Sequence, residues 1–571
     1  MRWLFFLFCA ALGLALLACG LLVPMHLRAV DAGVLERAGR SGPALLDEGK
    51  TLAGEQKLGT AQMLMQAARL ETFPGWDRLE QLIASQARQN PAALTWGADT
   101  RAKNLFPGNT PVPKAGTEPF TDFIVQQKNR DAALAALNRS PTLAVRELMR
   151  SRSLTKTVLL PPSSSASGQA FDAAVSVCGL LSDDGHLTTG LNRRIATLAE
   201  RANQGGDTRP LEEVLMDFLS LGERFNWDQL VAFVAQIPDP ETLHQLAGEA
   251  RAAGTNLPVL FAAVELSGKP AAVAGYLAKF SQTGLKDLGA SLAYGGAGVD
   301  ELAQRGQRFY RPDWERRVTA FASVGNFFYR AADLGLRQPQ LALAGKWLAY
   351  LLAGFFLAAA MHFARPAVSA LERPLQVRGF HLVREFLFSL GFLLVVLLLS
   401  EPFLAQESQK GGFSFRLLPL TTGGVVPAGI ASIQQTIMNP IILLTLLLFF
   451  VLQSLLYISC LVKLAEIRRQ RVPPRMKLRL LENEDHLFDA GLYLGFVGTI
   501  ISLIIASLGL VKFSLMAAYS STSFGIIFVV IFKIFHLRPA RRKLLLEAEA
   551  GTPPGADAGC VPSATATTPA Y

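Results

Sequence analysis

Six stretches of the chain are apolar over about the 20 residues that a helix needs to cross a membrane. The first covers residues 3–23, and a long polar region then extends to about residue 340. The other five stretches follow this region closely. They are residues 347–364, 386–405, 438–462, 490–510 and 513–532. The pattern predicts six transmembrane helices and a large polar domain between the first two.

Within the polar region, apolar residues recur at spacings of three and four, as in LEEVLMDFLSLGERF (211–225). This period is typical of amphipathic helices, and starts such as DPETL (239–243) resemble helix caps. No strand pattern appears. The helices between about 210 and 305 are short and regularly spaced, which favours stacked helical hairpins. We expect an all-α fold: a polytopic membrane protein with a large, solenoid-like helical domain outside the cytoplasm.

This pattern divides the chain into six parts. PPSSSASG (161–168) is a linker or long loop that is a candidate split within the large domain, and the last 20 residues read as a disordered tail. The expected parts are an N-terminal anchor (1–24), the helical domain (25–340), the second and third spans (341–405), an outer loop (406–436), a three-span module (437–540) and a basic end with the tail (541–571).

Composition and charge agree with a membrane protein and argue against nucleic-acid binding. Only 18% of the residues are charged, against about 25% in soluble chains. The net charge is +10, but Arg and Lys lie beside the apolar stretches, as in the segment 463–486 with seven of them. The loop 406–436 has only Lys410 and Arg416. By the positive-inside rule, both termini are cytoplasmic and the large domain lies outside, as in a bacterial inner-membrane protein in contact with lipid.

The N-terminus has two interpretations. LLACG (16–20) resembles a lipoprotein cleavage site with Cys19 as the lipidated residue. The apolar run continues through Val23, however, and 3–23 is long enough to span the membrane uncut. We favour an uncleaved signal anchor. Both interpretations place the large domain on the same side.

Motifs for catalysis, metals or cofactors are weak throughout. The five cysteines are scattered and form no CxxC or Cys/His cluster. GKT (49–51) lacks the glycine of a phosphate-binding loop, because Ala44 stands in its place. DDGH (183–186) reads as a solvated turn rather than a calcium loop. We expect no enzyme activity and no cofactor, and a helical surface that binds an envelope protein.

The fifth and sixth apolar stretches each carry a row of small and hydroxyl residues at helical spacing. Small residues let helices approach closely inside a membrane, and hydroxyls form hydrogen bonds there. A tightly packed helical hairpin is therefore the minimum prediction. The packing glycines are Gly491, Gly495, Gly498 and Gly525, and the hydroxyl residues include Thr499, Ser502, Ser521 and Thr522.

Two of these hydroxyls are predicted to lie at one depth. Thr499 is nine residues inside the cytoplasmic start of its span, and Thr522 is about nine residues inside the opposite side of an antiparallel partner. At 1.5 Å per residue both lie about 13 Å deep, near the midplane. Hydroxyls at matching depth favour a polar path, with Thr499, Thr522, Ser502 and Ser521 as candidate pore-lining residues.

LGFVGTIISLI (494–504) and AAYSSTSFGIIFVV (517–530) resemble the last two spans of the MotA/TolQ/ExbB proton-channel family. The resemblance covers about residues 436–545 and includes the order of the three spans. The segment between spans four and five is much shorter than in the family. The resemblance implies that Thr499 and Thr522 face a pore, that copies of the chain form a ring, and that a MotB/TolR/ExbD-like single-span partner supplies the titrating aspartate.

Spans four to six contain no ionisable residue at mid-depth, so a proton channel built on them needs a carboxylate from elsewhere. Asp489 and Lys533 lie at the cytoplasmic edge and are interpreted as anchors, and Glu401 as the end of the third span. The leading hypothesis is an energy-transducing channel subunit. The alternatives are a non-enzymatic envelope scaffold whose outer helices carry the role, and a transporter.

Overall fold

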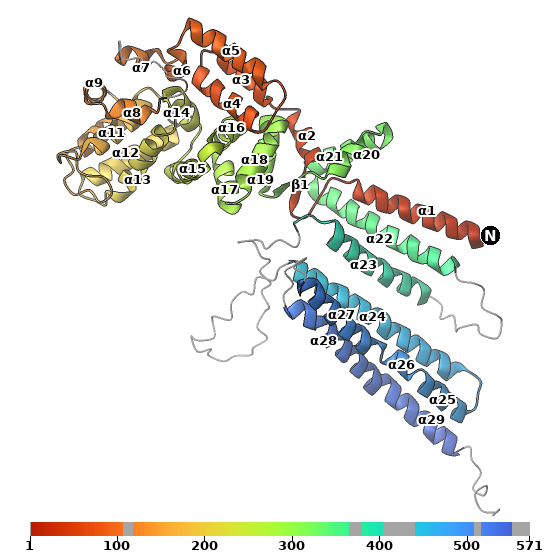
Figure 1. Cartoon of the computed structure of the whole chain (residues 1–571). Helices are drawn as coiled ribbons and strands as arrows, with labels where there is room; N and C mark the ends of the chain where they lie inside the picture. Colours follow the sequence, from red (N-terminus) through yellow and green to blue (C-terminus); the bar gives the residue numbers. More distant parts are fainter. Residues whose placement is uncertain (1, 107–117, 365–379, 404–439, 508–514, 551–571) are drawn as a thin grey trace, which may run out of the picture. The chain divides into compact units, whose positions relative to one another are not determined.

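The computed structural model of the chain describes residues 2–106, 118–364, 380–403, 440–507 and 515–550 (Figure 1). The described residues are mostly α-helical, which confirms the predicted class at this coarse level. The chain divides into two compact units. We call residues 23–343 the large helical unit, and residues 1–22 with 344–571 the apolar unit.

The large helical unit consists of short helices joined by brief turns. Its first half contains α2 (Ala32–Gly39), α3 (Leu45–Gly54), α4 (Leu58–Leu70), α5 (Trp76–Gln89), α6 (Ala93–Trp96), α7 (Thr100–Leu105), α8 (Phe120–Val125), α9 (Gln127–Leu137), α10 (Leu143–Ser151) and α11 (Gln169–Asp183). Its second half contains α12 (Thr189–Asn203), α13 (Arg209–Gly222), α14 (Trp227–Val234), α15 (Pro240–Ala253), α16 (Leu257–Ser267), α17 (Pro270–Lys279), α18 (Gly284–Ser291), α19 (Gly295–Arg305), α20 (Asp313–Thr319) and α21 (Ala322–Arg337), with 3₁₀ turns at Gly254–Asn256 and Leu292–Tyr294.

Helix boundaries in this unit follow the caps that the sequence supplies. In the predicted DPETL start, the Asp239 carboxylate accepts a hydrogen bond from the Thr242 amide at 2.9 Å, and Pro240 occupies the first turn. Asn226 and Gln229 form a reciprocal capping box at the start of α14. Trp227 follows this cap and is wholly buried in one apolar core that extends through the unit.

Two strands of three residues, β1 (Ala29–Asp31) and β2 (Arg308–Tyr310), were not expected from the sequence. They pair in parallel, with Ala29 opposite Arg308 and Asp31 opposite Tyr310. Three residues are too few to show the alternation that identifies a strand in a sequence. The pairing joins the beginning of the large helical unit to its end.

The apolar unit consists of longer helices (Figure 1). Its helices are α1 (Arg2–Leu21), α22 (Pro339–Ala364, which begins in the large helical unit), α23 (Phe380–Ser400), α24 (Pro440–Arg469), α25 (Pro474–Asn483), α26 (Asp485–Phe488), α27 (Ala490–Ser507), α28 (Leu515–Ile531), a π-helical segment (Phe532–Leu537) and α29 (Arg538–Ala550).

Four helical stretches are long and apolar enough to cross a membrane: Trp3–Leu21, Pro339–Ala364, Leu446–Arg469 and Tyr519–Glu549. They overlap the first, second, fourth and sixth predicted spans, although the last extends well beyond residue 532. The described parts of the third and fifth, Glu385–Ser400 and Ala490–Ile500, are shorter apolar helices, so six spans remain a prediction. The predicted outer loop 406–436, Lys512 and most of the C-terminal tail lie outside the described residues.

Close contacts hold the apolar unit together. α27 packs along α28, α28 packs on α24, and α24 packs on α23. Gly13 and Gly20 of α1 face Leu357 and Tyr350 of α22. Past the apolar run of α24, a small separate core joins its last turns to α25 and α29. Its buried members are Cys460, Leu464, Ile467, Leu481, Phe488, Phe532, Leu537, Ala540 and Leu544.

Candidate functional site

The backbones of α27 and α28 are in direct contact at the predicted glycines. A Cβ atom placed on Gly495 would lie 2.8 Å from the Ser521 carbonyl oxygen and 3.1 Å from Thr522 Cα. One placed on Gly525 would lie 2.6 Å from the Gly491 carbonyl oxygen. Any side chain larger than hydrogen would force the helices apart. The structure thus gives these glycines the close approach that a small-residue stripe permits.

This approach brings Thr499 and Thr522 into contact. Their Oγ1 atoms lie 2.5 Å apart, and each hydroxyl is also within hydrogen-bond distance of the Gly495 carbonyl oxygen, at 3.0 Å and 3.2 Å respectively. Thr499 is buried and Thr522 is half-buried. Two hydroxyls from different helices and one backbone carbonyl therefore form a compact polar cluster between apolar helices.

The other two candidate hydroxyl residues differ in what the structure describes. Ser521 is buried, with 1% of its surface exposed, and packs against Gly498. Its Oγ has no hydrogen-bond partner among the described residues. The side chain of Ser502 lies outside the described residues, although its backbone belongs to α27. Ser521 is therefore a hydroxyl with unused hydrogen-bonding capacity beside the threonine pair.

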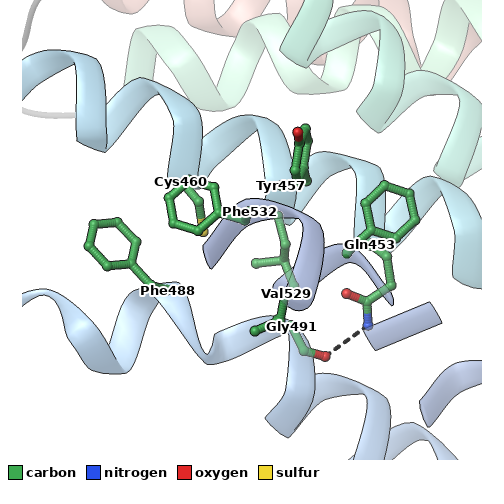
Figure 2. Close-up of a pocket in the computed structure, with 9 residues that line it drawn as sticks. Gln453, Tyr457, Cys460, Phe488, Gly491, Val529 and Phe532 are labelled. Atoms are coloured by element: carbon green, nitrogen blue, oxygen red, sulfur yellow. Dashed lines mark hydrogen bonds between the residues drawn. The ribbon is translucent and has the colours of Figure 1, made fainter. Parts of the chain in front are cut away.

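A third helix adds Gln453, which the sequence analysis did not single out. Gln453 lies in the middle of α24 and is 1% exposed. Its Nε2 donates a hydrogen bond of 2.9 Å to the carbonyl oxygen of Gly491, as Figure 2 shows. Its Oε1 is buried and has no partner within the described part of the chain. The signal in the sequence was a lone amide inside an otherwise apolar run, and such residues in membrane helices usually face other helices.

Gln453 and Gly491 also line a small cavity between α24, α26, α27 and α28 (Figure 2). Its volume of about 10 Å³ is enough for one water molecule. Aromatic rings of Tyr457, Phe488 and Phe532 form much of the remaining wall. We use the name polar seam for Gln453, Thr499, Ser521 and Thr522 together.

Charged residues lie at the end of these helices, away from the threonine pair. Lys533 Nζ lies 2.7 Å from an oxygen of Asp489, and both side chains are partly exposed. The Tyr457 hydroxyl lies 2.9 Å from Nε2 of His536 in the π-helical segment. The sequences of α27 and α28 contain no Asp, Glu, Lys, Arg or His. The side chains of the polar seam can therefore donate and accept hydrogen bonds, but none of them titrates near neutral pH.

Cys19, the candidate lipidation residue, lies within α1 with its side chain exposed. The next residue, Gly20, packs on the ring of Tyr350, so this part of α1 is joined to α22 in the apolar unit. Lipidation at Cys19 remains a prediction.

In the large helical unit, the DDGH turn takes part in a polar cluster that the sequence analysis missed. His186 Nε2 lies 3.0 Å from Asp99, which also accepts a bond of 2.8 Å from the Trp227 indole. Asp99, Asp184 and His186 are close enough together to share an ion. Arg101, however, pairs with Asp183 and Asp184, and Asp99 caps α7. These contacts join α7, α11 and α14, and we interpret the cluster as structural.

Electrostatics agree with this interpretation. Burial alone would raise the pKa of Asp99, but hydrogen bonds from His186, the Ala102 amide and Trp227 outweigh it and lower the pKa to about 2. Asp99 is therefore an anionic acceptor throughout the physiological range.

Comparison with known protein families, with curated proteins and with solved structures finds no match to this chain.

Proposed function

We propose that this chain is a channel-type subunit of a membrane complex that couples ion flow to movement of an envelope partner. One observation carries the proposal: the polar seam, in which Thr499 and Thr522 bond to each other between apolar helices and Gln453 bonds to the Gly491 carbonyl of the same hairpin. Ser521 and Gln453 each keep a buried polar atom without a partner among the described residues. Burying such atoms is unfavourable, so they favour water or a second chain as a partner.

The rest of the proposal follows the family resemblance and the charge pattern. Copies of the chain assemble into a ring around a single-span partner that supplies a carboxylate. Six spans cross a bacterial inner membrane with both termini in the cytoplasm, and the large helical unit contacts an envelope protein outside it. The four membrane-length helices support the membrane location.

A different observation favours a second candidate, a non-enzymatic envelope scaffold. The hydroxyls of Thr499 and Thr522 already have an acceptor in the Gly495 carbonyl, so hairpin packing alone accounts for both. In that case the large helical unit carries the function and the hydroxyls only stabilise α27 against α28.

The two candidates are separated by proton-flux measurements with a pH-sensitive dye in inverted membrane vesicles from cells that contain the chain and its natural partners. Thr499→Val with Thr522→Val removes both hydroxyls at nearly constant shape, whereas Thr499→Ser with Thr522→Ser keeps them. Ser454→Ala is the matched control on α24, because the half-buried Ser454 hydroxyl donates a hydrogen bond to its own helix, at the Phe450 carbonyl.

A channel predicts that flux falls at least about tenfold in the valine pair, which corresponds to about 1.4 kcal/mol in barrier height, and survives in the serine pair and in Ser454→Ala. Flux that is equal in all variants with normal membrane levels rejects the channel and favours the scaffold.

A further inference from the structure

Two helices at the end of the large helical unit leave aromatic side chains exposed. α21 packs on α2, and α20 packs on α21 (Figure 1). Trp314 on α20 is 44% exposed, Phe321 between the two helices is 67% exposed, and Phe327 on α21 is 41% exposed. No other Trp, Phe or Tyr side chain among the described residues of this unit is as exposed. Such apolar groups, gathered in one segment, mark an interaction surface.

α21 buries one face against the unit and leaves a different apolar face open. Its buried residues recur at helical spacing and are Gly325, Phe328, Ala332 and Gly335. Phe327 and Leu334 are both exposed and are seven residues apart, which places them on one side of the helix, about 100° from Phe328. The packing that holds α21 in place therefore does not use Phe327 or Leu334.

An arginine follows each of these exposed residues at the same interval. Arg330 lies three residues after Phe327, and Arg337 lies three residues after Leu334. On α20, an arginine at position 317 likewise follows Trp314. All three arginines are exposed, and residues three apart are neighbours on a helix surface. Each large apolar side chain thus has a guanidinium group beside it, whose apolar stem lies along an apolar surface while the charge points to water or to phosphate.

The acidic groups of the two helices do not neutralise these arginines. Glu315 is buried, and burial raises its pKa well above the usual range of a glutamate. Asp333 pairs with Arg37 of α2 at 2.8 Å. The side chains of α20 that lie outside the described residues are Asp313, Arg316 and Val318. The exposed face, as far as the structure describes it, is therefore cationic as well as apolar.

The chain leads directly from this face into a helix of membrane length. α21 ends at Arg337 and α22 begins at Pro339, so that only Gln338, with non-helical backbone angles, separates them. The 26 residues of α22 extend over about 39 Å, whereas the hydrocarbon core of a bilayer is about 30 Å thick. When α22 crosses a membrane, its first turn and the last turn of α21 consequently lie at the level of the lipid headgroups.

We propose that α20 and α21 bind the membrane surface, with Trp314, Phe327 and Leu334 at the boundary between headgroups and acyl chains and the neighbouring arginines on the phosphates of anionic phospholipids. Helices that lie in the membrane interface combine Trp, Phe and Leu with Arg and Lys in this way, and Trp is enriched at that depth. The inference needs α22 to cross the membrane. It does not depend on the polar seam or on ion conduction.

Photo-crosslinking of the full chain tests contact with lipid directly. One variant carries a benzophenone side chain in place of Phe327, and a second carries it in place of Leu334. Adducts are identified by mass spectrometry in native membranes, where protein partners are present, and in vesicles of phosphatidylcholine mixed with phosphatidylglycerol.

Two further positions serve as controls. Leu348 of α22 is exposed within a helix of membrane length and is the positive control. Leu143 on α10 is the negative control, because it is an exposed leucine of the same unit. α10 packs on α11 and α12, at the other end of the unit from α21 (Figure 1). Because all of the replaced side chains are exposed, the buried core is left intact.

We expect lipid adducts at Phe327, Leu334 and Leu348 and none at Leu143. In the mixed vesicles, phosphatidylglycerol should be enriched among the adducts at Phe327 at least about twofold over its share of the lipid, because arginines near an anionic surface are attracted to it. Arg330→Gln combined with Arg337→Gln keeps the apolar side chains and should abolish this enrichment.

Protein adducts in place of lipid adducts at Phe327 and Leu334 in native membranes would assign the face to a protein partner and overturn the proposal. Absence of lipid adducts at both positions overturns it too, whether or not Leu348 gives them. Enrichment that persists without the two arginines overturns their assignment to phosphate. The flux experiment on the threonine pair has a separate outcome, so either proposal fails without the other.

Discussion

Thr499 on α27 and Thr522 on α28 share a hydrogen bond of 2.5 Å between their hydroxyl oxygens, with the Gly495 carbonyl as a further acceptor for both. Hydrogen bonds between membrane helices contribute about 0.6 kcal/mol on average and at most about 1.7 kcal/mol. Two hydroxyls that share one acceptor should not contribute independently.

We therefore predict that Thr499→Val and Thr522→Val each lower the free energy of unfolding by about 0.5–1.5 kcal/mol, and that the double variant loses less than the sum. The measurement is a double-mutant cycle from unfolding in mixed detergent. Strict additivity would show that the two hydroxyls do not interact.

Gly495 is one of the positions at which the hairpin leaves no room for a side chain. Gly495→Ala places a methyl group 2.8 Å from the Ser521 carbonyl oxygen, so the helices must separate, and we expect a loss of about 1–3 kcal/mol. Gly345→Ala on α22 is the matched control, because no atom lies within 4 Å of its Cβ position. Unfolding in detergent should distinguish the two, and equal stabilities would contradict the backbone contact.

Glu212 stabilises the segment after α10 through backbone amides. Its carboxylate accepts hydrogen bonds from residues 158–160, and one from the Thr208 hydroxyl at 2.7 Å. Glu212→Gln should destabilise this segment by about 1–3 kcal/mol. A neutral amide oxygen accepts hydrogen bonds more weakly than a carboxylate, and the NH2 group of the glutamine would face backbone N–H groups that are themselves donors. Hydrogen exchange of residues 158–160 measures the effect. Glu213→Gln, on the exposed side of the same helix, should leave exchange unchanged.

The same carboxylate predicts a pH dependence. Burial raises the pKa of Glu212, but the bonds from Thr208 and the three amides outweigh it and hold the pKa below the usual range of a glutamate. When the pKa of a carboxyl group is lower in the folded state than in the unfolded state, its ionisation stabilises the fold at pH values above the unfolded pKa. This stabilisation is lost as the pH falls through the folded pKa. The difference in the free energy of unfolding between wild type and Glu212→Gln should therefore be largest near pH 7 and decrease below about pH 4. A difference that is constant with pH would contradict this.

Asp228 predicts the opposite sign. Burial raises its pKa to about 6 despite hydrogen bonds from Thr60. The folded state thus favours the neutral acid. The protonated carboxyl group therefore contributes its full stability to the fold below the unfolded pKa, and this stability is lost as the pH rises through about 6. The melting temperature of Asp228→Asn minus that of wild type should therefore be larger at about pH 8 than at about pH 5. Asp77→Asn, at an exposed position, should show no such trend in thermal unfolding.

Residue counting from the sequence placed Thr499 and Thr522 at one depth because antiparallel helices rise by a constant 1.5 Å per residue. The glycine spacing likewise identified the faces that meet. Gln453 was missed because a single amide does not alter the hydropathy of α24. Its role depends on rotation of α24 toward Gly491, which is set by packing rather than by the local sequence.

Lys346 and Glu401 were missed for a different reason. Hydropathy ends a span at a charge, so residue 347 was taken as a start, whereas α22 begins at Pro339 and continues through Lys346. Glu401, which directly follows α23, lies 3.9 Å from Lys346, and a sequence does not state which helices are neighbours. The short strands β1 and β2 also depend on contact between distant segments.

α24 runs without interruption from Pro440 to Arg469, a length of about 45 Å, whereas the hydrocarbon core of a bilayer is about 30 Å thick. Its last turns are fixed to α25 and α29 by the small core around Leu464 and Phe532. The helix is therefore one continuous rigid element from the region of Gln453 to its last turns. A rotation that displaces Gln453 must also turn Arg469, roughly 24 Å away, and with it the basic bundle at that end.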